Sequence, residues 1–145
     1  MKLSTKGRYG VRLMVDLAMH YGEGPILLKE IAERQDISEK YLWQLIAPLK
    51  HAGLLNSMRG AHGGYLLAKA PAQITLKDIV TVVEGSLCLV DCVDQPAACP
   101  RTETCATREV WREVSAKILQ TLEAFTLENL VEQQTRKANT LNYVI

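Results

Sequence analysis

Residues 28–67 constrain the fold most, because they combine two short amphipathic segments with a glycine-rich basic turn. Apolar residues recur every three or four positions in both segments, at Leu28, Ile31, Leu42, Leu45, Ile46 and Leu49. Residues 35–38 form a tight connection between the segments, and the hydroxyl of Ser38 can cap the second helix. Two helices joined by so short a turn match the helix-turn-helix pattern.

The second helix, expected from Glu39 to about Ala52, presents a mostly polar face opposite its apolar stripe. At 100° per residue this face carries Lys40, Gln44, Ala47 and His51. Gln44 can form two hydrogen bonds with adenine in the major groove, and we expect Lys40 and Tyr41 beside it nearest the bases. An ordinary solvated helix face fits these residues equally well when the helix is considered alone.

A predicted β-hairpin follows, with strands at 54–58 and 65–67 and a turn at 59–64. Three glycines in that turn allow positive φ angles at low cost, so the hairpin can close. Cations on such a turn after a helix-turn-helix are typical of a wing that contacts phosphates or a narrow minor groove. The predicted DNA-binding residues are therefore Lys40, Tyr41, Gln44, Arg59, Gly60, His62 and Gly63.

The charge is divided unevenly along the chain. The formal net charge is only +1, but residues 1–69 carry ten Lys/Arg and six Asp/Glu, whereas residues 70–145 carry seven and ten. A basic half suits nucleic acid. The N-terminus lacks a signal-peptide pattern and no run is apolar enough for a membrane span, so we expect a cytoplasmic protein. The three histidines are scattered, and no nucleophile–base pair indicates an enzyme.

The remaining segments predict a mainly α fold with one small β-hairpin. We expect a first helix from about Thr5 to Tyr21 and a short helix near 76–84 with a capping box. A long helix then carries its apolar stripe on Val110, Trp111, Val114, Ile118, Leu122 and Phe125. We expect this stripe to pair with a second copy, although packing on its own domain is the alternative. A short helix from Thr126 and a loosely ordered tail from Gln133 complete the prediction.

Residues 86–107 show no periodicity and contain all four cysteines. Cys92, Cys99 and Cys105 lie on irregular chain that could bring three thiolates together, and thiolates are preferred ligands of iron–sulfur clusters and zinc. The spacing lacks the close pairs of zinc ribbons. Zinc binding and thiol redox sensing are the alternatives, and Cys88, in an apolar run, is expected to be buried and inert. The predicted domains are a winged helix-turn-helix (1–84), a cluster-binding loop (85–107) and a dimerisation helix with tail (108–145).

The whole chain resembles the Rrf-type winged-helix transcription regulators, which include the iron–sulfur sensor IscR and the nitric-oxide sensor NsrR. The resemblance is carried by residues 1–10 (MKLSTKGRYG), 31–35 (IAERQ), 38–42 (SEKYL), 59–60 (RG), 63–67 (GGYLL) and the three cysteines before Trp111-Arg112. It implies a homodimer built on the long helix and binding to palindromic double-stranded DNA. It also implies an iron–sulfur cluster on Cys92, Cys99 and Cys105, which we expect to be [2Fe–2S] rather than [4Fe–4S].

The chain departs from the family pattern at the fourth cluster ligand. Arg108 stands where IscR-like members carry a histidine, and arginine cannot be a ligand. Arg8 stands where NsrR-like members carry an aspartate. The candidates that remain are Asp91, Glu103, Glu109, Cys88 or a side chain of the second subunit.

Overall fold

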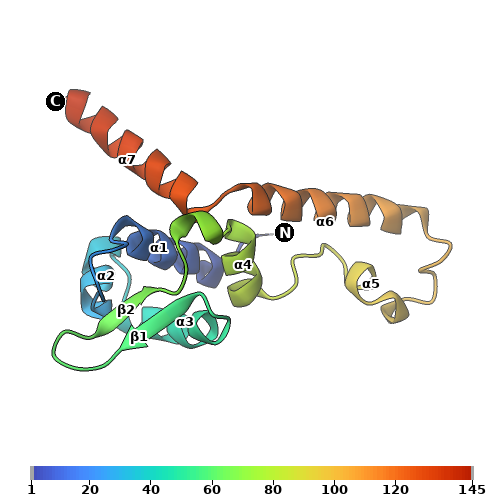
Figure 1. Ribbon diagram of the computed structural model, residues 1–145. Helices are drawn as coiled ribbons and strands as arrows, with labels where there is room; N and C mark the ends of the chain where they lie inside the picture. Colours follow the sequence, from blue (N-terminus) through green and yellow to red (C-terminus); the bar gives the residue numbers. More distant parts are fainter. Residues whose placement is uncertain (1, 145) are drawn as a thin grey trace.

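The computed structural model describes residues 2–144 as a mainly helical protein with one two-stranded antiparallel sheet, as predicted (Figure 1). The helices are Thr5–Met19 (α1), Leu28–Gln35 (α2), Glu39–His51 (α3), Leu76–Glu84 (α4), Asp91–Asp94 (α5), Ala106–Ala124 (α6) and Leu127–Val144 (α7). The strands are Leu55–Met58 (β1) and Gly64–Leu67 (β2), and single 3₁₀ turns occupy Pro71–Gln73 and Pro96–Ala98. The strands pair in register from Leu55 with Leu67 to Met58 with Gly64.

One apolar core holds α1 to α4, the hairpin and the start of α7 together. Its fully buried side chains include Leu13, Met14, Leu17, Ile31, Leu42, Leu45, Leu49, Leu55, Ile74, Ile79 and Leu127. Burying each such side chain stabilises the fold by roughly 1.5–3 kcal/mol. The apolar stripe of α3 lies in this core, so the opposite face of α3 is held outward.

The predicted helix caps are confirmed. The Ser38 hydroxyl accepts a hydrogen bond from the Tyr41 N–H at 3.1 Å. At α4, the Thr75 hydroxyl accepts from the Asp78 N–H at 3.1 Å, and the Asp78 carboxylate accepts from the Thr75 N–H at 2.9 Å. These reciprocal bonds satisfy backbone donors at the helix start, so both helices begin where the local sequence predicts.

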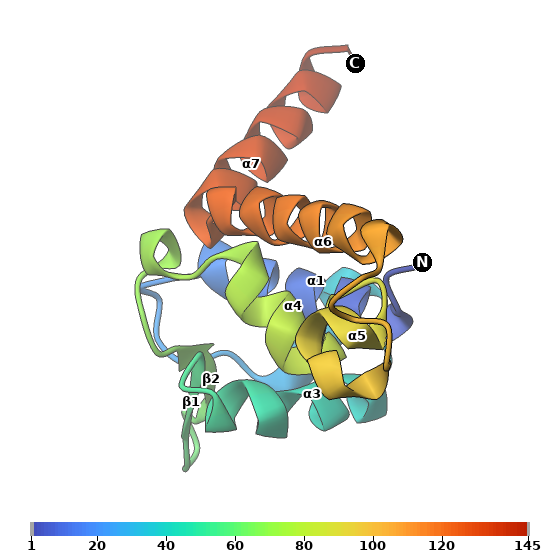
Figure 2. The ribbon, with the colours of Figure 1, turned by 90° about the vertical axis from the view of Figure 1, so that its right-hand side faces the viewer.

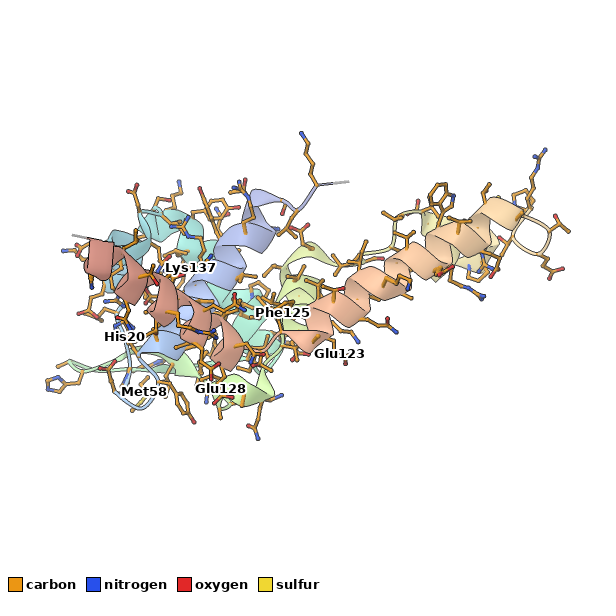
Figure 3. The ribbon with its side chains drawn as sticks, turned by 90° about the horizontal axis from the view of Figure 1, so that it is seen from above. His20, Met58, Glu123, Phe125, Glu128 and Lys137 are labelled. Carbon is orange, nitrogen blue, oxygen red and sulfur yellow. The ribbon has the colours of Figure 1, made fainter. Side chains whose placement is uncertain are left out.

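The junction between α6 and α7 is bonded to the segment that precedes α4. The Leu76 N–H donates to the Phe125 carbonyl at 2.9 Å, and the Leu127 N–H donates to the Ile74 carbonyl at 2.9 Å. Figure 3 shows Phe125 at the bend between the two helices, with α7 above α1. Figures 1 and 2 show that α3 and the hairpin lie on one side of the molecule and α6 on the other.

The expectation of a loosely ordered tail after Gln133 is wrong for the described residues. Helix α7 runs without interruption from Leu127 to Val144, and Ile145 lies outside the described residues. The segment contains no glycine or proline and many good helix formers. Its first turns pack on the core through Leu127, Leu130 and Val131, so the helix is nucleated there and continues into solvent.

Candidate nucleic-acid interface and cysteine loop

Helix α3 exposes Lys40, Gln44 and His51, as its periodicity predicts. Tyr41 differs, because it is half-buried and its ring meets the ring of Tyr9 edge-on at a centroid distance of 5.4 Å. Edge-to-face pairs of this kind stabilise packing. Tyr41 therefore connects α3 to α1.

The cations near the start of α1 gather around the same aromatic pair. The guanidinium of Arg8 lies 5.8 Å from the centre of the Tyr9 ring, and that of Arg12 lies 5.5 Å from it. Arg12 also donates to the side chain of Gln35 at 3.2 Å and to its carbonyl oxygen. This arrangement places positive charge beside the N-terminal half of α3, where a nucleic-acid backbone could be contacted.

A buried carboxylate fixes the turn between α2 and α3. Asp16 on α1 is 2 % exposed and accepts two hydrogen bonds from Arg34, at 2.7 and 3.1 Å, and one from the Gln35 amide at 2.9 Å. The hydrogen bond with Asp16 is the main cause of the raised pKa of Arg34. The next residue, Asp36, adopts a left-handed conformation (φ 52°) and ends α2. The position of the turn thus depends on side chains from α1.

The hairpin has the close backbone contacts that its glycines allow. A Cβ atom on Gly63 would overlap the Met58 carbonyl oxygen, and one on Gly64 (φ +145°) would overlap the backbone of Ile26. Ile26 is bonded to Tyr65 in both directions, at 2.8 and 2.9 Å, so the hairpin base is fixed. At the tip Arg59, Gly60 and His62 are exposed, whereas Gly63 is buried.

Lys50 joins helix α3 to the hairpin. Its ammonium group donates to the Ser57 hydroxyl on β1 at 2.6 Å. Helix α3 and the hairpin tip therefore lie on one surface in a fixed relative position, as a winged helix requires.

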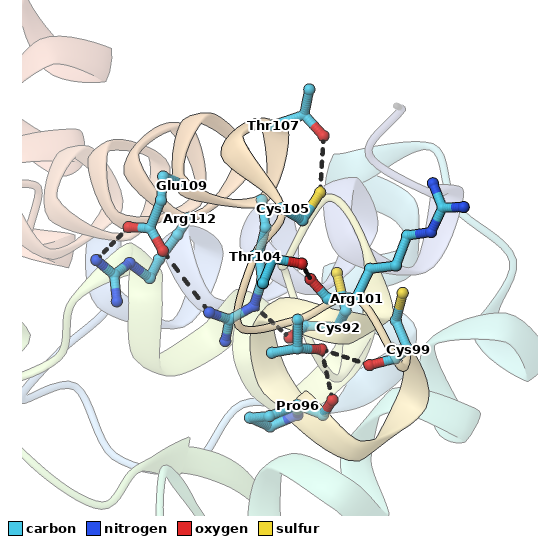
Figure 4. Close-up of polar contacts among 11 residues, drawn as sticks. Cys92, Pro96, Cys99, Arg101, Thr104, Cys105, Thr107, Glu109 and Arg112 are labelled. Carbon is cyan, nitrogen blue, oxygen red and sulfur yellow. Dashed lines mark hydrogen bonds and ion pairs between the residues drawn. The ribbon is translucent and has the colours of Figure 1, made fainter.

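The cysteine loop is ordered by short-range hydrogen bonds (Figure 4). The Arg108 guanidinium donates to the Cys92 carbonyl at 3.1 Å and tethers α5 to the start of α6. The Thr102 hydroxyl lies 2.7 Å from the Cys99 carbonyl and 2.6 Å from the Pro96 carbonyl. Arg108 occupies the position at which IscR-like proteins carry a histidine. In this protein its guanidinium is hydrogen-bonded to the backbone carbonyl of Cys92.

The four thiols are free and differ in environment. A hydrogen bond to the Asp94 carboxylate at 2.8 Å, together with burial, raises the pKa of Cys88. A hydrogen bond from the Thr107 hydroxyl, followed by one from the Arg108 N–H, lowers the pKa of Cys105. The expectation that Cys88 is buried is not met, because the side chain is partly exposed.

The donor chemistry of this loop fits a thiolate-bound metal centre. The three candidate ligands, Cys92, Cys99 and Cys105, are partly exposed, and none of them forms a disulfide. Within residues 2–144, however, no three His, Cys, Asp or Glu side chains are already gathered at metal-binding positions. The irregular backbone around Cys99 and Cys105 is the part that would have to close around a metal.

Helix α6 leaves apolar side chains uncovered. Val110, Trp111 and Val114 are exposed on it. Beside this face a cavity of about 740 Å³ lies between α4, the start of the cysteine loop and α6, and it is lined mainly by apolar side chains, including Leu3, Val80, Leu87, Leu89, Trp111 and Ile118. Large exposed apolar patches mark interaction sites.

Two residues of these sites, Tyr9 and Asp16, are not among the site residues predicted from the sequence. Tyr9 was not singled out because its partner Tyr41 lies 32 positions later, on another helix. Asp16 offered a signal, since a carboxylate within the apolar stripe of α1, between Leu13 and Leu17, needs a cationic partner when buried.

The family comparison agrees with this architecture. Residues 3–133 match the Rrf2 family, described as an iron-dependent transcriptional regulator. The chain belongs to the Rrf2 family of transcriptional regulators. The protein rrf2 of Nitratidesulfovibrio vulgaris is 44 % identical over 131 residues, which cover 90 % of this chain and 87 % of that protein.

Solved Rrf2-family relatives share the fold. The structure of CymR, the global cysteine regulator of B. subtilis, has a TM-score of 0.77 at 42 % identity and covers 92 % of this chain and 98 % of its own. The structure of IscR of T. potens has a TM-score of 0.76 at 46 % identity, and the match covers 92 % of this chain and 88 % of that one. These relatives are regulators and not enzymes. No helix between residues 2 and 144 has the length and apolar character needed to cross a membrane.

Proposed function

We propose that this protein is a homodimeric regulator that binds palindromic double-stranded DNA with an affinity set by an iron–sulfur cluster on Cys92, Cys99 and Cys105. The observation that carries the proposal is the common surface of α3 and the hairpin, on which a polar helix face and exposed cations stand together. Membership of the Rrf2 family supports the same function. Because such a regulator must reach chromosomal DNA, we propose that the protein is located in the cytoplasm.

Helix α3 would enter the major groove. Lys40 and Gln44 face outward and can reach base edges, with Gln44 suited to adenine. Tyr41, packed on Tyr9, would reach the groove only with its hydroxyl. At the hairpin, Arg59 and His62 would contact phosphate or the adjacent minor groove, and the exposed backbone at Gly60 permits close approach. Gly63 is buried, so its part would be to shape the turn that presents these residues.

Dimerisation would use the apolar face of α6. The exposed side chains Val110, Trp111 and Val114 have the spacing of one helix face, and a second copy of the same helix can cover them. A two-fold dimer would place its two α3 helices on half-sites about one helical turn of DNA apart, roughly 34 Å.

The cysteine loop would provide the sensing element. When bound, an iron–sulfur cluster would supply a labile centre whose loss removes a crosslink within the loop. The three cysteines would hold it, and Arg108 would keep the Cys92 segment against α6 through the Cys92 carbonyl. Cys88 and Glu109 already have partners in Asp94 and Arg112, which makes them weaker candidates for the fourth ligand.

Anaerobic purification with iron, sulfide and zinc analysis tests the cluster. The natural protein is expected to contain iron and acid-labile sulfide and to change its affinity for selected duplexes when the cluster is removed. The variant with Cys92→Ala, Cys99→Ala and Cys105→Ala should remain folded and dimeric but lose both properties. Cys88→Ala is the matched control and should keep them. Identical DNA binding with and without the cluster would contradict the sensing role.

A thiol-based redox regulator is the second candidate, and one observation favours it. Cys105 combines partial exposure with a lowered pKa, which is the environment of reactive thiols. The relative CymR of Staphylococcus aureus has a structure of an oxidised form. Metal-free protein whose DNA affinity changes on mild oxidation, and not in Cys105→Ala, would establish this alternative. Stoichiometric zinc without sulfide would instead indicate a zinc-stabilised regulator.

A further inference from the structure

Trp43 is the most exposed aromatic side chain among those that the structure describes, with 63 % of its surface accessible. It lies on α3, one residue before Gln44. Tryptophan combines a large apolar surface with a single N–H donor, and such side chains contribute strongly to binding when a partner buries them. It lies beside the polar outward face of α3, where a binding partner could bury it.

Helix geometry places Trp43 on the flank of α3 that faces the hairpin. Trp43 precedes Lys50 by seven residues, nearly two full turns, so the two side chains share a flank. Lys50 is bonded to Ser57 of β1 on that flank. Tyr41 lies on the opposite flank, against Tyr9 of α1. The outward face thus presents Trp43 on the hairpin side and Lys40 with Gln44 at its centre.

In the major groove of DNA, few chemical groups could make an apolar contact with Trp43. Base edges there display hydrogen-bonding groups with one apolar exception, the 5-methyl group of thymine. A helix that brings Gln44 to an adenine would place the neighbouring indole beside the methyl group of the same or an adjacent A·T pair. A second copy of the protein is not expected to cover Trp43. The proposed dimer contact uses the apolar face of α6, and α6 lies on the side of the molecule opposite α3 (Figures 1 and 2).

We propose that Trp43 is a specificity-determining residue that reads thymine 5-methyl groups in the major groove, next to the base pair contacted by Gln44. The proposal rests on the DNA-binding function proposed above. It extends that function by naming an apolar reader that selects T over C and over uracil, in addition to the polar readers.

Duplexes selected from a random-sequence pool with the natural protein are the probe. Each thymine of one selected duplex is replaced in turn by uracil, which removes only the methyl group. We expect the affinity of the natural protein to fall about fourfold at one or two positions, the effect of one buried methyl group. Trp43→Ala should bind the thymine duplex at least tenfold more weakly, and the same uracil substitutions should leave its affinity unchanged.

Two variants control the measurement. Trp43→Phe keeps an apolar ring and should retain most of the sensitivity to uracil. Leu141→Ala removes another well-exposed apolar side chain, far from α3 on α7, and should behave as the natural protein. Circular dichroism would check that each variant is folded before its binding is compared.

The outcomes separate this inference from the proposed function. If uracil weakens binding of Trp43→Ala as much as binding of the natural protein, or weakens neither, Trp43 does not read thymine methyl groups and the inference is overturned. If the natural protein enriches no duplex, the DNA-binding function fails and the inference fails with it.

Discussion

The carboxylate of Glu84, the last residue of α4, accepts a hydrogen bond from the backbone N–H of Gly7 in the first turn of α1, at 3.1 Å. The same oxygen accepts from the Ser4 N–H at 2.9 Å and from the Ser4 hydroxyl. A negative charge is thus placed at a helix N-terminus, where the backbone dipoles favour it. A Cβ atom on residue 7 would overlap this carboxylate, so the Glu84 side chain would have to move away from the N–H groups that it now accepts from.

Glu84→Gln is expected to lower the free energy of unfolding by about 1 kcal/mol, because a charge-assisted cap becomes a neutral one. Gly7→Ala normally stabilises a helix but here should destabilise it, since the methyl group displaces the carboxylate. The two changes should be less than additive in chemical denaturation. Gly10→Ala, whose Cβ would lie 3.3 Å from a Val83 methyl, is the control and should cost less. Full additivity would contradict the shared contact.

Asp16→Asn is expected to destabilise the protein by about 3 kcal/mol, because it breaks a buried ion pair and leaves Arg34 without its counterion. The Arg34 side chain is 37 % exposed, so we expect the lower end of the usual range. Glu109→Gln, which breaks the surface pair with Arg112, should cost less than about 1 kcal/mol. Chemical denaturation measures the free energy of unfolding of both variants. Equal losses of stability in the two would show that burial of the Asp16 ion pair adds nothing to its contribution.

Arg59→Ala is expected to weaken DNA binding for all sequences alike. The slope of log K against log salt concentration should fall in magnitude by about 1, because one phosphate contact is lost. Arg136→Ala, on the distant helix α7, should leave the slope unchanged. A reduced affinity with an unaltered slope would mean that Arg59 does not contact phosphate. Fluorescence anisotropy over a salt series provides the measurement.

If the protein forms the proposed dimer, Val114→Asp is expected to convert it into monomers, because a charge would be buried in the proposed apolar contact between two α6 helices, at a cost of several kcal/mol. Ala116→Asp places the same charge two residues later, on the opposite side of the helix, and should leave the proposed dimer intact. Sedimentation velocity distinguishes the two. Dimeric Val114→Asp protein would indicate that another surface mediates assembly.

The features that could be predicted from the sequence are those determined by neighbours along the chain. Ser38 and Thr75 were predicted as caps because a cap and its N–H partner lie three residues apart. The pairing of Asp16 with Arg34 could not be predicted, since it requires the relative placement of two helices. The same holds for Glu84 and Gly7, which are 77 positions apart.

The candidate site was predictable to a similar degree. The exposed face of α3 followed from helical periodicity, whereas Tyr41 was placed nearest the bases without knowledge that Tyr9 covers its ring. The polar composition after Gln133 suggested disorder, but uninterrupted helix-forming residues extend α7 from an anchored first turn. The cysteines were identifiable by chemistry, and their arrangement depends on loop contacts such as that of Arg108.

The backbone bonds at Phe125 and Leu127 anchor one end of α6 to the core. With 19 residues at a rise of about 1.5 Å each, this helix is a lever roughly 28 Å long. A rotation of about 5° at the anchored end displaces the far tip by roughly 2 Å. The cysteine loop is attached to this far end of α6. A change in the shape of the loop would therefore act on the helix at the point farthest from its anchored end, where a given force turns the helix most.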